Sequence, residues 1–479
     1  MPEPDPRRWL ALLTCCSALF MTLLDVSVTN VALPSIGQAM GAAPTELQWV
    51  VSGYTLAFGL VPVLAGRLGD DHGRRLMFQI GAASFAATSL LAGLAPSVPV
   101  LIAARVAQGL AGGLINPQVS GLIQQLFHGH ERGRAFGVLG TTVGLGTALG
   151  PLVGGVLIAL GGAQLGWRLV FFVNVPIGVI VILLARRLLP LDPALGRHRL
   201  DVLGAALLGG ATFCVLFASV EYRALPGWLL GSLVVPVLVL LALFFRRERR
   251  LTRLRSDPLV DLRLFREPSY TAGSLLALTC FPALAGVPLV LTLYYQQGLG
   301  YTALESGLAA TAYAIGNAIS APLAGRVVTR VGRPLLVAAT LTYGAGAIAL
   351  AVLVAHAPTQ HVAFVLAPAL LVMGAGAGAI VTPNQTLTLV GIDPAMGSTA
   401  GGVLQTAQRI GLAVGQAVIG AAFFAGVGTT GSTATRYGDA LGAAIVVAVG
   451  FIALATAVGV TDLVRTRISG PPPRRGKTA

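Results

Sequence analysis

Apolar segments long enough to cross a membrane recur along almost the whole chain of 479 residues. A helix needs about 20 apolar residues to span a hydrocarbon core of about 30 Å. The composition agrees with this pattern, because 55% of the residues are hydrophobic and 10% are charged, whereas soluble domains carry about 25% charged residues. Long continuous runs favour helices over a barrel, whose strands need only short alternating segments. The chain is therefore predicted to be an all-α membrane protein.

The apolar runs predict fourteen transmembrane helices. They cover residues 9–33, 46–66, 76–95, 98–114, 135–160, 169–185, 201–220, 228–245, 270–295, 304–325, 335–354, 362–381, 398–425 and 439–463. The first run follows two arginines, as a secretory signal would, but it is too long and lacks a cleavage site, so we interpret it as an uncleaved helix. The four cysteines lie inside apolar segments without ligand spacing, which disfavours disulfides and metal sites.

The positions of the basic residues predict the orientation of the helices. The chain has 32 lysines and arginines against 18 acids. With the N-terminus inside, 27 of the basic residues fall in cytoplasmic segments, 3 in external loops and 2, Arg105 and Arg409, within helices. This bias is the positive-inside signal. It predicts a protein of the inner (cytoplasmic) membrane with both termini in the cytoplasm, and it assigns the positive charge to topology and membrane lipid rather than to nucleic acid.

An internal repeat divides the chain into two halves. The pattern Gly-Arg-x5-Gly-Arg occurs at Gly66 and again at Gly325, which is 259 residues later (325 − 66). Both copies follow a predicted helix in the same orientation, which is typical of transporters built from two similar bundles. We therefore predict a six-helix bundle in residues 1–190 and another in residues 269–479, the latter with a basic tail. Residues 191–268 supply two inserted helices and a basic cytoplasmic loop.

Asp25 is the only acid deep within a predicted helix. An ionised carboxylate in lipid costs several kcal/mol unless it has a partner, water or a function. At about 1.5 Å per residue, Asp25 lies roughly 12 Å from the outer end of its helix and Arg105 roughly 10 Å from that of the fourth helix. Such a pair can load and release a proton; a fixed pair that only joins two helices is the alternative. The repeat places Leu284 opposite Asp25, so proton handling is predicted for the first half alone.

Other polar residues also lie within apolar helices. Arg409 is mid-span with no acid on its own helix, and it either faces a central cavity or bonds to carbonyls of a neighbouring helix. Glu221 and Glu305 lie near external helix ends and are interpreted as solvated residues, with a subsidiary proton or cation site as the alternative. Four uncharged candidates for lining a substrate cavity are Asn30, Tyr54, Asn317 and Gln405.

Four motifs make the sequence resemble the major facilitator superfamily, and within it the fourteen-helix drug:H+ antiporters. They are Leu24-Asp25-Val26-Ser27-Val28-Thr29-Asn30-Val31-Ala32-Leu33-Pro34 in the first helix, the Gly66 to Arg75 loop, Arg105 with Gln108-Gly109 in the fourth helix, and Gly144-x5-Gly150-Pro151-x2-Gly154-Gly155 in the fifth. The resemblance covers essentially the whole chain. It implies that the acid of the first helix and the arginine of the fourth, here Asp25 and Arg105, take part in protonation.

The resemblance also implies that the loop after the second helix is a conformational latch. Asp70 would act as the latch and Arg74 would bond nearby, while Gly66 and Gly73 permit the tight turn. An ordinary positively charged turn is the alternative. In the second copy of the repeat Thr329 replaces the acid, so a latch there is expected to be weaker.

The glycine pattern of the fifth helix is associated in the family with exporters rather than importers. It comprises Gly146, Gly150, Pro151 and Gly154. The four-residue spacing of the glycines is also that of plain tight packing between helices, and this alternative stays open.

The residues and the resemblance together predict a proton-driven exporter of small amphipathic molecules, a cationic drug being one option. The predicted partners are a small-molecule substrate, protons and membrane lipid, and the predicted state is a monomer. The chain has no nucleotide-binding glycine loop, so the proton gradient is the predicted energy source, with no cofactor, no metal and no enzymatic activity. A nutrient or metabolite importer on the same fold is one alternative, and a non-transporting sensor or membrane enzyme is another.

Overall fold

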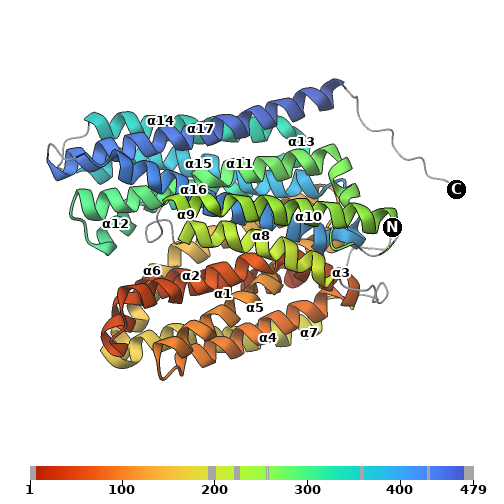
Figure 1. Cartoon of the computed structure of the whole chain (residues 1–479), viewed down its shortest axis with the longest axis horizontal. Helices are drawn as coiled ribbons and strands as arrows, with labels where there is room; N and C mark the ends of the chain where they lie inside the picture. Colours follow the sequence, from red (N-terminus) through yellow and green to blue (C-terminus); the bar gives the residue numbers. More distant parts are fainter. Residues whose placement is uncertain are drawn as a thin grey trace.

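The computed structural model describes residues 7–191, 201–220, 227–254, 256, 258–356, 361–428 and 432–468. Figure 1 shows long helices that run along one common direction, with the N-terminal helices (red to orange) in one layer and the C-terminal helices (green to blue) in another. No strand occurs within these described ranges. Because a helix forms its hydrogen bonds within its own segment, this bundle needs no water to satisfy its backbone.

We use "first half" for α1 to α7 and "second half" for α11 to α17. The first half contains α1 (Arg8–Met40), α2 (Pro44–Leu60), α3 (Pro62–His72), α4 (Arg74–Gly93), α5 (Val98–Leu126), α6 (His130–Phe172) and α7 (Asn174–Leu188). Between the halves come α8 (Val202–Val220), α9 (Gly227–Ser232), α10 (Val234–Arg253) and η1 (Leu262–Arg266). The second half contains α11 (Pro268–Leu293), η2 (Tyr294–Gly298), α12 (Ala303–Ala309), α13 (Thr311–Val331), α14 (Arg333–His356), α15 (Val362–Leu389), η3 (Pro394–Met396), α16 (Gly397–Gly426) and α17 (Thr433–Ile468).

Ten helices in the described part of the chain are long and apolar enough to cross a membrane, or eleven if α2 and α3, which meet at 47°, form one bent span. Apart from an end residue or two of 76–95 and 201–220, the predicted ranges fall on helical residues. Four of them contain a one-residue break, at Val61, Val173, Leu233 and Ala310, and the range 135–160 lies inside the longer α6. The count of fourteen therefore stays a prediction.

Proline and glycine set the main breaks between helices. Pro62 has no N–H to donate, so the chain bends between α2 and α3. Gly162 turns the chain within α6 at a φ of 65°. Gly73 ends α3 at a φ of 98°, and Gly332, its counterpart in the repeat, ends α13 at a φ of 68°. Positive φ at these turns is the reason that both copies of the motif need a glycine there.

The internal repeat reappears as a contact within each half. A Cβ atom on Gly109 of α5 would overlap the carbonyl oxygen of Tyr54 on α2, and a Cβ atom on Gly374 of α15 would overlap that of Tyr313 on α13. Tyr313 follows Tyr54 by 259 residues (313 − 54), and Gly374 follows Gly109 by 265 residues (374 − 109). Small residues at these crossings let the helix backbones touch. Each half is thus built around the same close crossing.

A second pair of repeated contacts joins the two halves. A Cβ atom on Gly66 of α3 would overlap the carbonyl oxygen of Ser398 on α16, and one on Gly325 of α13 would lie 2.6 Å from the carbonyl oxygen of Gly133 on α6. Both contacts lie where α3 and α13 end and where α6 and α16 begin. We call this the basic end of the bundle, because most arginines lie in the segments that connect helices there. The halves are closely packed at the basic end.

One of the helices between the halves, α8, contacts both of them. α8 packs against α10 and also touches α2 and α16, and in Figure 1 the α8–α10 pair lies between the two layers. Leu56 of α2, Leu216 of α8 and Ala413 of α16 form an apolar cluster there with Trp49 and Phe217. α8 therefore contacts one helix from each half.

Candidate functional site

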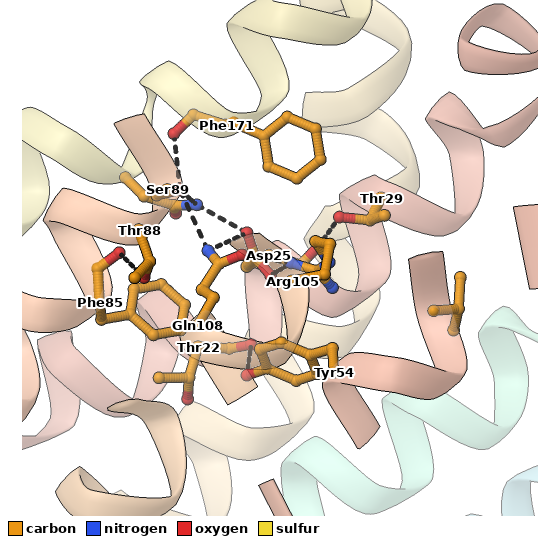
Figure 2. A network of polar contacts seen from close by, with 12 residues as sticks. Thr22, Asp25, Thr29, Tyr54, Phe85, Thr88, Ser89, Arg105, Gln108 and Phe171 are labelled. Carbon is orange, nitrogen blue, oxygen red and sulfur yellow. Dashed lines mark hydrogen bonds and ion pairs between the residues drawn. The ribbon is translucent and has the colours of Figure 1, made fainter. Parts of the chain in front are cut away.

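Asp25 lies on α1 and is cut off from solvent, with 1% of its surface exposed. Its Oδ2 atom forms an ion pair of 2.5 Å with Nη1 of Arg105 on α5. Its Oδ1 atom accepts hydrogen bonds from Nε2 of Gln108 (3.0 Å) and from Nδ2 of Asn174 on α7 (2.8 Å). Figure 2 shows the Asp25 carboxylate at the centre of this network, beside Arg105 and Gln108. The structure therefore brings together the two residues whose depths match in the sequence.

Arg105 is bonded on several sides. Its Nη1 atom also donates to Oε1 of Gln108 (2.6 Å), and its Nε atom donates to the carbonyl oxygen of Val50 (3.2 Å). Its guanidinium carbon lies 4.4 Å from the centre of the Tyr54 ring and 5.7 Å from that of the Phe171 ring. Removing either member of a buried ion pair leaves the other charge uncompensated, which costs about 3–5 kcal/mol. Protonation of Asp25 would therefore leave the positive charge of Arg105 uncompensated.

Sequence analysis missed the side chains that complete this site. Gln108 on α5 was noted only as part of a motif, and Ser89 on α4 and Asn174 on α7 were not noted. Ser89 accepts hydrogen bonds from Nε2 of Gln108 (3.1 Å) and Nδ2 of Asn174 (2.9 Å), and it donates to the carbonyl oxygen of Phe171 (2.9 Å). All three side chains are fully buried. Their one signal in the sequence is a polar residue inside an apolar run.

The groups that bond to the Asp25 carboxylate are all hydrogen-bond donors. A shell of donors stabilises the ionised carboxylate, because an ionised carboxylate accepts only, whereas a protonated carboxyl must place its own O–H. Protonation would therefore weaken the contacts between α1 and α5 and between α1 and α7. In the second half the repeat places Leu284 and Leu370 at the positions of Asp25 and Arg105, and both are apolar.

A second polar cluster lies at the basic end, where Asp70 of α3 meets the first turn of α16. Its two carboxylate oxygens accept hydrogen bonds from the backbone N–H groups of Ser398 (3.1 Å) and Thr399 (2.8 Å). Arg74 forms an ion pair with Asp70 at 2.9 Å and donates to the carbonyl oxygens of Gly121 (3.0 Å) and of Pro394. The loop singled out in the sequence thus joins the two halves through an acid at a helix N-terminus.

The glycines of the predicted exporter pattern lie within the first half. On α6, a Cβ atom at Gly146 would lie 2.9 Å from Cβ of Leu23, one at Gly150 would overlap the Ser27 side chain, and one at Gly154 would lie 3.1 Å from Cγ1 of Val28. These partners are all on α1, the helix that carries Asp25. Pro151 follows Gly150 in α6. The pattern therefore sets the distance between α6 and the helix of the buried acid.

The five candidate cavity residues are not gathered at one place. Tyr54 lies under the guanidinium of Arg105, and its hydroxyl donates to the carbonyl oxygen of Thr22 at 3.5 Å. Asn30 is exposed, and Asn317 is half-buried on α13. Gln405 donates to the hydroxyl of Ser120 on α5 (3.3 Å), and Arg409 lies over the Phe58 ring. Of the two acids near external ends, Glu305 caps α12 together with Thr302, and Glu221 lies outside the described residues.

The comparison with protein families identifies the type of protein that contains these sites. The model described as "Major Facilitator Superfamily" matches residues 15–416. The chain belongs to this superfamily. As a member of the major facilitator superfamily, it is a multi-pass membrane transporter of small molecules and not an enzyme.

Individual superfamily members agree with this assignment. The chain is 36% identical over 431 residues to the probable actinorhodin transporter of Streptomyces coelicolor. The aligned region covers 89% of this chain and 74% of the relative. It is 33% identical over 433 residues to the tetracenomycin C resistance and export protein of Streptomyces glaucescens. That alignment covers 88% of this chain and 77% of the relative. The human organic anion transporter has a similar fold, with a TM-score of 0.67 over 95% of this chain and 100% of that one, at 16% identity.

Proposed function

We propose that this protein exports small organic molecules in exchange for protons, by alternating access between its two halves. The observation that carries the proposal is the buried carboxylate of Asp25, which is paired with Arg105 and surrounded by further donors. An ionisable group inside the membrane is costly, and such groups mark ion pathways and proton relays. A carboxylate that is bonded only to donors loses its charge when it takes up one proton, and its ion pair with Arg105 is then lost.

The proposed sidedness follows from charge. We take the basic end as cytoplasmic, in line with the positive-inside bias, so both termini lie in the cytoplasm and the membrane is the inner membrane. On this assignment the contacts at Gly66 and Gly325 close the cytoplasmic side. We further propose fourteen helices in total. Residues 1–190 and 269–479 form the two bundles, residues 191–268 supply two inserted helices, and the protein acts as a monomer without a cofactor.

In the proposed cycle a proton from outside neutralises Asp25. Arg105 then lacks its counter-ion and keeps only neutral partners, Gln108 and Val50. An unpaired buried charge is unfavourable, so the protonated protein favours a different arrangement of α1 against α5 and α7. A ligand or proton can shift such an equilibrium only by its differential affinity for the two states. Opening toward the cytoplasm releases the proton and restores the pair.

Two observations support export as the direction. Relatives that are similar over most of this chain carry names that describe resistance and export. The glycine pattern of α6, which the resemblance associates with exporters, packs directly on α1 beside Asp25. The movement of α1 that the cycle requires therefore takes place against the glycine face of α6.

The test has two steps. First, cells that express the protein are screened against antibiotics and dyes to find compounds to which it confers resistance. Inside-out vesicles are then loaded with a pH gradient, and uphill uptake of the best compound is measured for the wild type and Asp25→Asn. We expect wild-type uptake to stop when the gradient is collapsed and Asp25→Asn to lose uphill uptake while it still inserts in the membrane.

The control is Glu305→Gln, which removes an exposed acid that caps α12, and it should transport as the wild type does. Uphill transport that persists undiminished in Asp25→Asn would reject Asp25 as the coupling group and leave it as a fixed structural pair. Wild-type transport that ignores the pH gradient would reject proton coupling altogether.

A further inference from the structure

Arg409 is a cation at the junction of the two halves, and no described residue forms a hydrogen bond with its side chain. It lies on α16, half-buried, with its guanidinium carbon 4.2 Å from the centre of the Phe58 ring on α2. Within the described ranges its guanidinium forms neither a hydrogen bond nor an ion pair. The buried arginines elsewhere do: Arg105 bonds to Asp25, Arg74 to Asp70, and Arg132 to the carbonyl oxygens of Phe127 and Gln124. Arg409 is thus left with an aromatic face alone.

The internal repeat indicates that the packing of the halves does not require this charge. The crossing of α16 on α2 and α3 corresponds to the crossing of α6 on α13, since Ser398 follows Gly133 by 265 residues (398 − 133). By the same offset Arg409 corresponds to Gly144 (409 − 144), and Phe58 corresponds to Asn317 (317 − 58 = 259). Gly144 does face Asn317, because a Cβ atom on it would lie 3.9 Å from Oδ1 of Asn317. One crossing therefore packs with a glycine where the other carries a guanidinium.

Two amides on the same helix add unused hydrogen-bonding atoms. Gln405 precedes Gln408 by three residues and Arg409 by four, so its side chain is a neighbour of both on the surface of α16. Gln408 is 9% exposed, and its Nε2 atom has no partner. Gln405 donates to Ser120, while its Oε1 atom has no partner. Buried polar atoms without partners are uncommon in folded proteins, and here they accompany an uncompensated cation.

Aromatic rings lie beside this cation. The Phe58 ring under Arg409 is 5.9 Å from the Tyr54 ring, and the Tyr54 ring in turn lies under Arg105. Arg105 already has its counter-ion in Asp25. An anion that enters between α2 and α16 would therefore be attracted to Arg409, whose charge is not neutralised. Both rings are buried and Arg409 covers a face of Phe58, so the surroundings of the cation are apolar. The chemistry that this arrangement fits is an oxyanion carried on an apolar organic skeleton.

We propose that Arg409, together with Gln405 and Gln408, binds the carboxylate or another oxyanion of the transported molecule, so that the substrates of this exporter are apolar organic acids. This inference rests on the proposed export function and names its substrate class. It differs from the cationic option that the sequence left open. Arginine suits the role because its planar guanidinium matches a carboxylate with two parallel hydrogen bonds.

The test uses matched ligands that differ only in charge. Fused-ring aromatic carboxylates of increasing size, with anthracene carboxylate as the central probe, are compared with their neutral methyl esters and cationic aminomethyl analogues. Binding to purified protein in nanodiscs of phosphatidylcholine is measured by fluorescence and by the shift in melting temperature. We expect the acids to bind best and Arg409→Gln to weaken them by about 10- to 100-fold, which is the value of a hydrogen bond to a charged group. Binding of the esters should not change.

Two further variants guard against a merely structural effect. Arg409→Lys keeps the charge and should retain part of the acid binding, with the melting temperature of the ligand-free protein recorded for each variant. Arg168→Gln is the matched control, because Arg168 also stacks on a ring, at 4.3 Å from Trp167, but bonds to the carbonyl oxygens of Gly93 and Ala95. It should bind the acids as the wild type does.

The outcomes separate this inference from the proposed function. Preference for the amines, or equal acid binding by the wild type and Arg409→Gln, overturns the anion site. pH-driven export of neutral or cationic compounds would still uphold the proposed function. If added phosphatidylglycerol displaces the acids from the wild type, and Arg409→Gln abolishes this competition, the oxyanion at Arg409 is a lipid phosphate and the substrate claim fails. Acid binding without any pH-driven transport would instead refute the proposed function.

Discussion

Asp70 accepts a hydrogen bond of 2.8 Å from the backbone N–H of Thr399, and this bond joins the end of α3 to the first turn of α16. The first N–H groups of a helix have no partner within the helix and form its positive end. A carboxylate stabilises that end only while the halves meet there. In the second half Thr329 stands at the position of Asp70, and Arg333, the counterpart of Arg74, pairs instead with Asp462 of α17. The contact between an acid and a helix N-terminus that joins the halves is therefore made by the first half alone.

Asp70→Asn should shift the protein toward opening at the basic end. The change removes the ion pair with Arg74 and weakens the two bonds to α16, and hydrogen bonds to a charged group contribute about 1.5–3 kcal/mol each. A loss of that size changes the ratio of the two states by about 10- to 100-fold. Spin labels at the exposed positions His72 and Arg330, one in each half, should report longer distances.

Asp71→Asn is the matched control for the contact of Asp70 with α16. Asp71 is the neighbouring buried acid, but it pairs with Arg67 on its own helix at 3.1 Å. The distribution of distances between the two spin labels in Asp71→Asn should resemble that of the wild type. Equal distributions for Asp70→Asn and the wild type would mean that backbone packing at Gly66 holds the halves together without help from the carboxylate.

Gly150→Ala should destabilise the protein and impair transport, whereas Gly155→Ala should do neither. A Cβ atom at Gly150 would overlap Ser27 of α1, while a Cβ atom at Gly155 would meet nothing within 4 Å. Overpacking costs about 1–3 kcal/mol, and a free helical Gly→Ala change stabilises by up to about 1 kcal/mol. Melting temperatures in detergent and the vesicle assay check both variants. A similar loss in the two would show that glycine is needed for something other than contact with α1.

Asn174→Ala should lower stability because it removes a donor from Asp25. An unsatisfied buried group costs about 1–3 kcal/mol, and Asn174 also bonds to Ser89. A double-mutant cycle with Asp25→Asn isolates the contribution of the Asn174–Asp25 bond. We expect the two changes to be less than additive. Strict additivity would indicate that Asn174 acts through Ser89 alone.

Glu248 should make stability depend on pH near neutrality. It lies on α10, past the predicted span that ends at residue 245, and is fully buried with its Oε2 atom accepting from Val260 at 3.3 Å. Burial, the dominant cause, raises its pKa from 4.5 to about 7; the negative charge of Asp201 adds to this, while the N–H groups of Val260 and Leu259 and the charge of Arg247 oppose it. Because the folded protein holds this proton more tightly than the unfolded chain does, the protonated carboxyl stabilises the fold. This stabilisation is complete below the unfolded-state pKa and is lost as the pH rises through about 7.

The measurement compares the melting temperatures of the wild type and Glu248→Gln from pH 5 to pH 8.5. The wild type should become less stable as the pH rises through this range, by a few degrees, and the variant should be flatter. Parallel curves would contradict the assignment of this pH dependence to Glu248.

The sequence was most informative where one helix, or its repeat, determined the answer. The depth of Asp25 and of Arg105 along their helices follows from the helical rise, and the two residues do form a pair. The loop with Asp70 was identified from its glycines and its repeat. The contact with Thr399 depends on where α16 begins, which lies more than 300 residues further along the chain. Asn174 and Ser89 could not be assigned to the site of Asp25, because the sequences of α7 and α4 do not show how each helix is rotated about its own axis.

By itself the sequence determined that the chain forms apolar helices, that its positive charge gathers at one end of them, that its two halves repeat, and that one acid lies deep in the first half. Only the tertiary structure decided which polar groups meet: Asp25 is enclosed by donors from two other helices, whereas Arg409 faces an aromatic ring and no anion of the described residues. The physical reason is that hydrophobicity fixes how long each helix is. The rotation and tilt that aim its side chains are set by small residues, such as Gly66 and Gly109, touching backbones far away in the sequence.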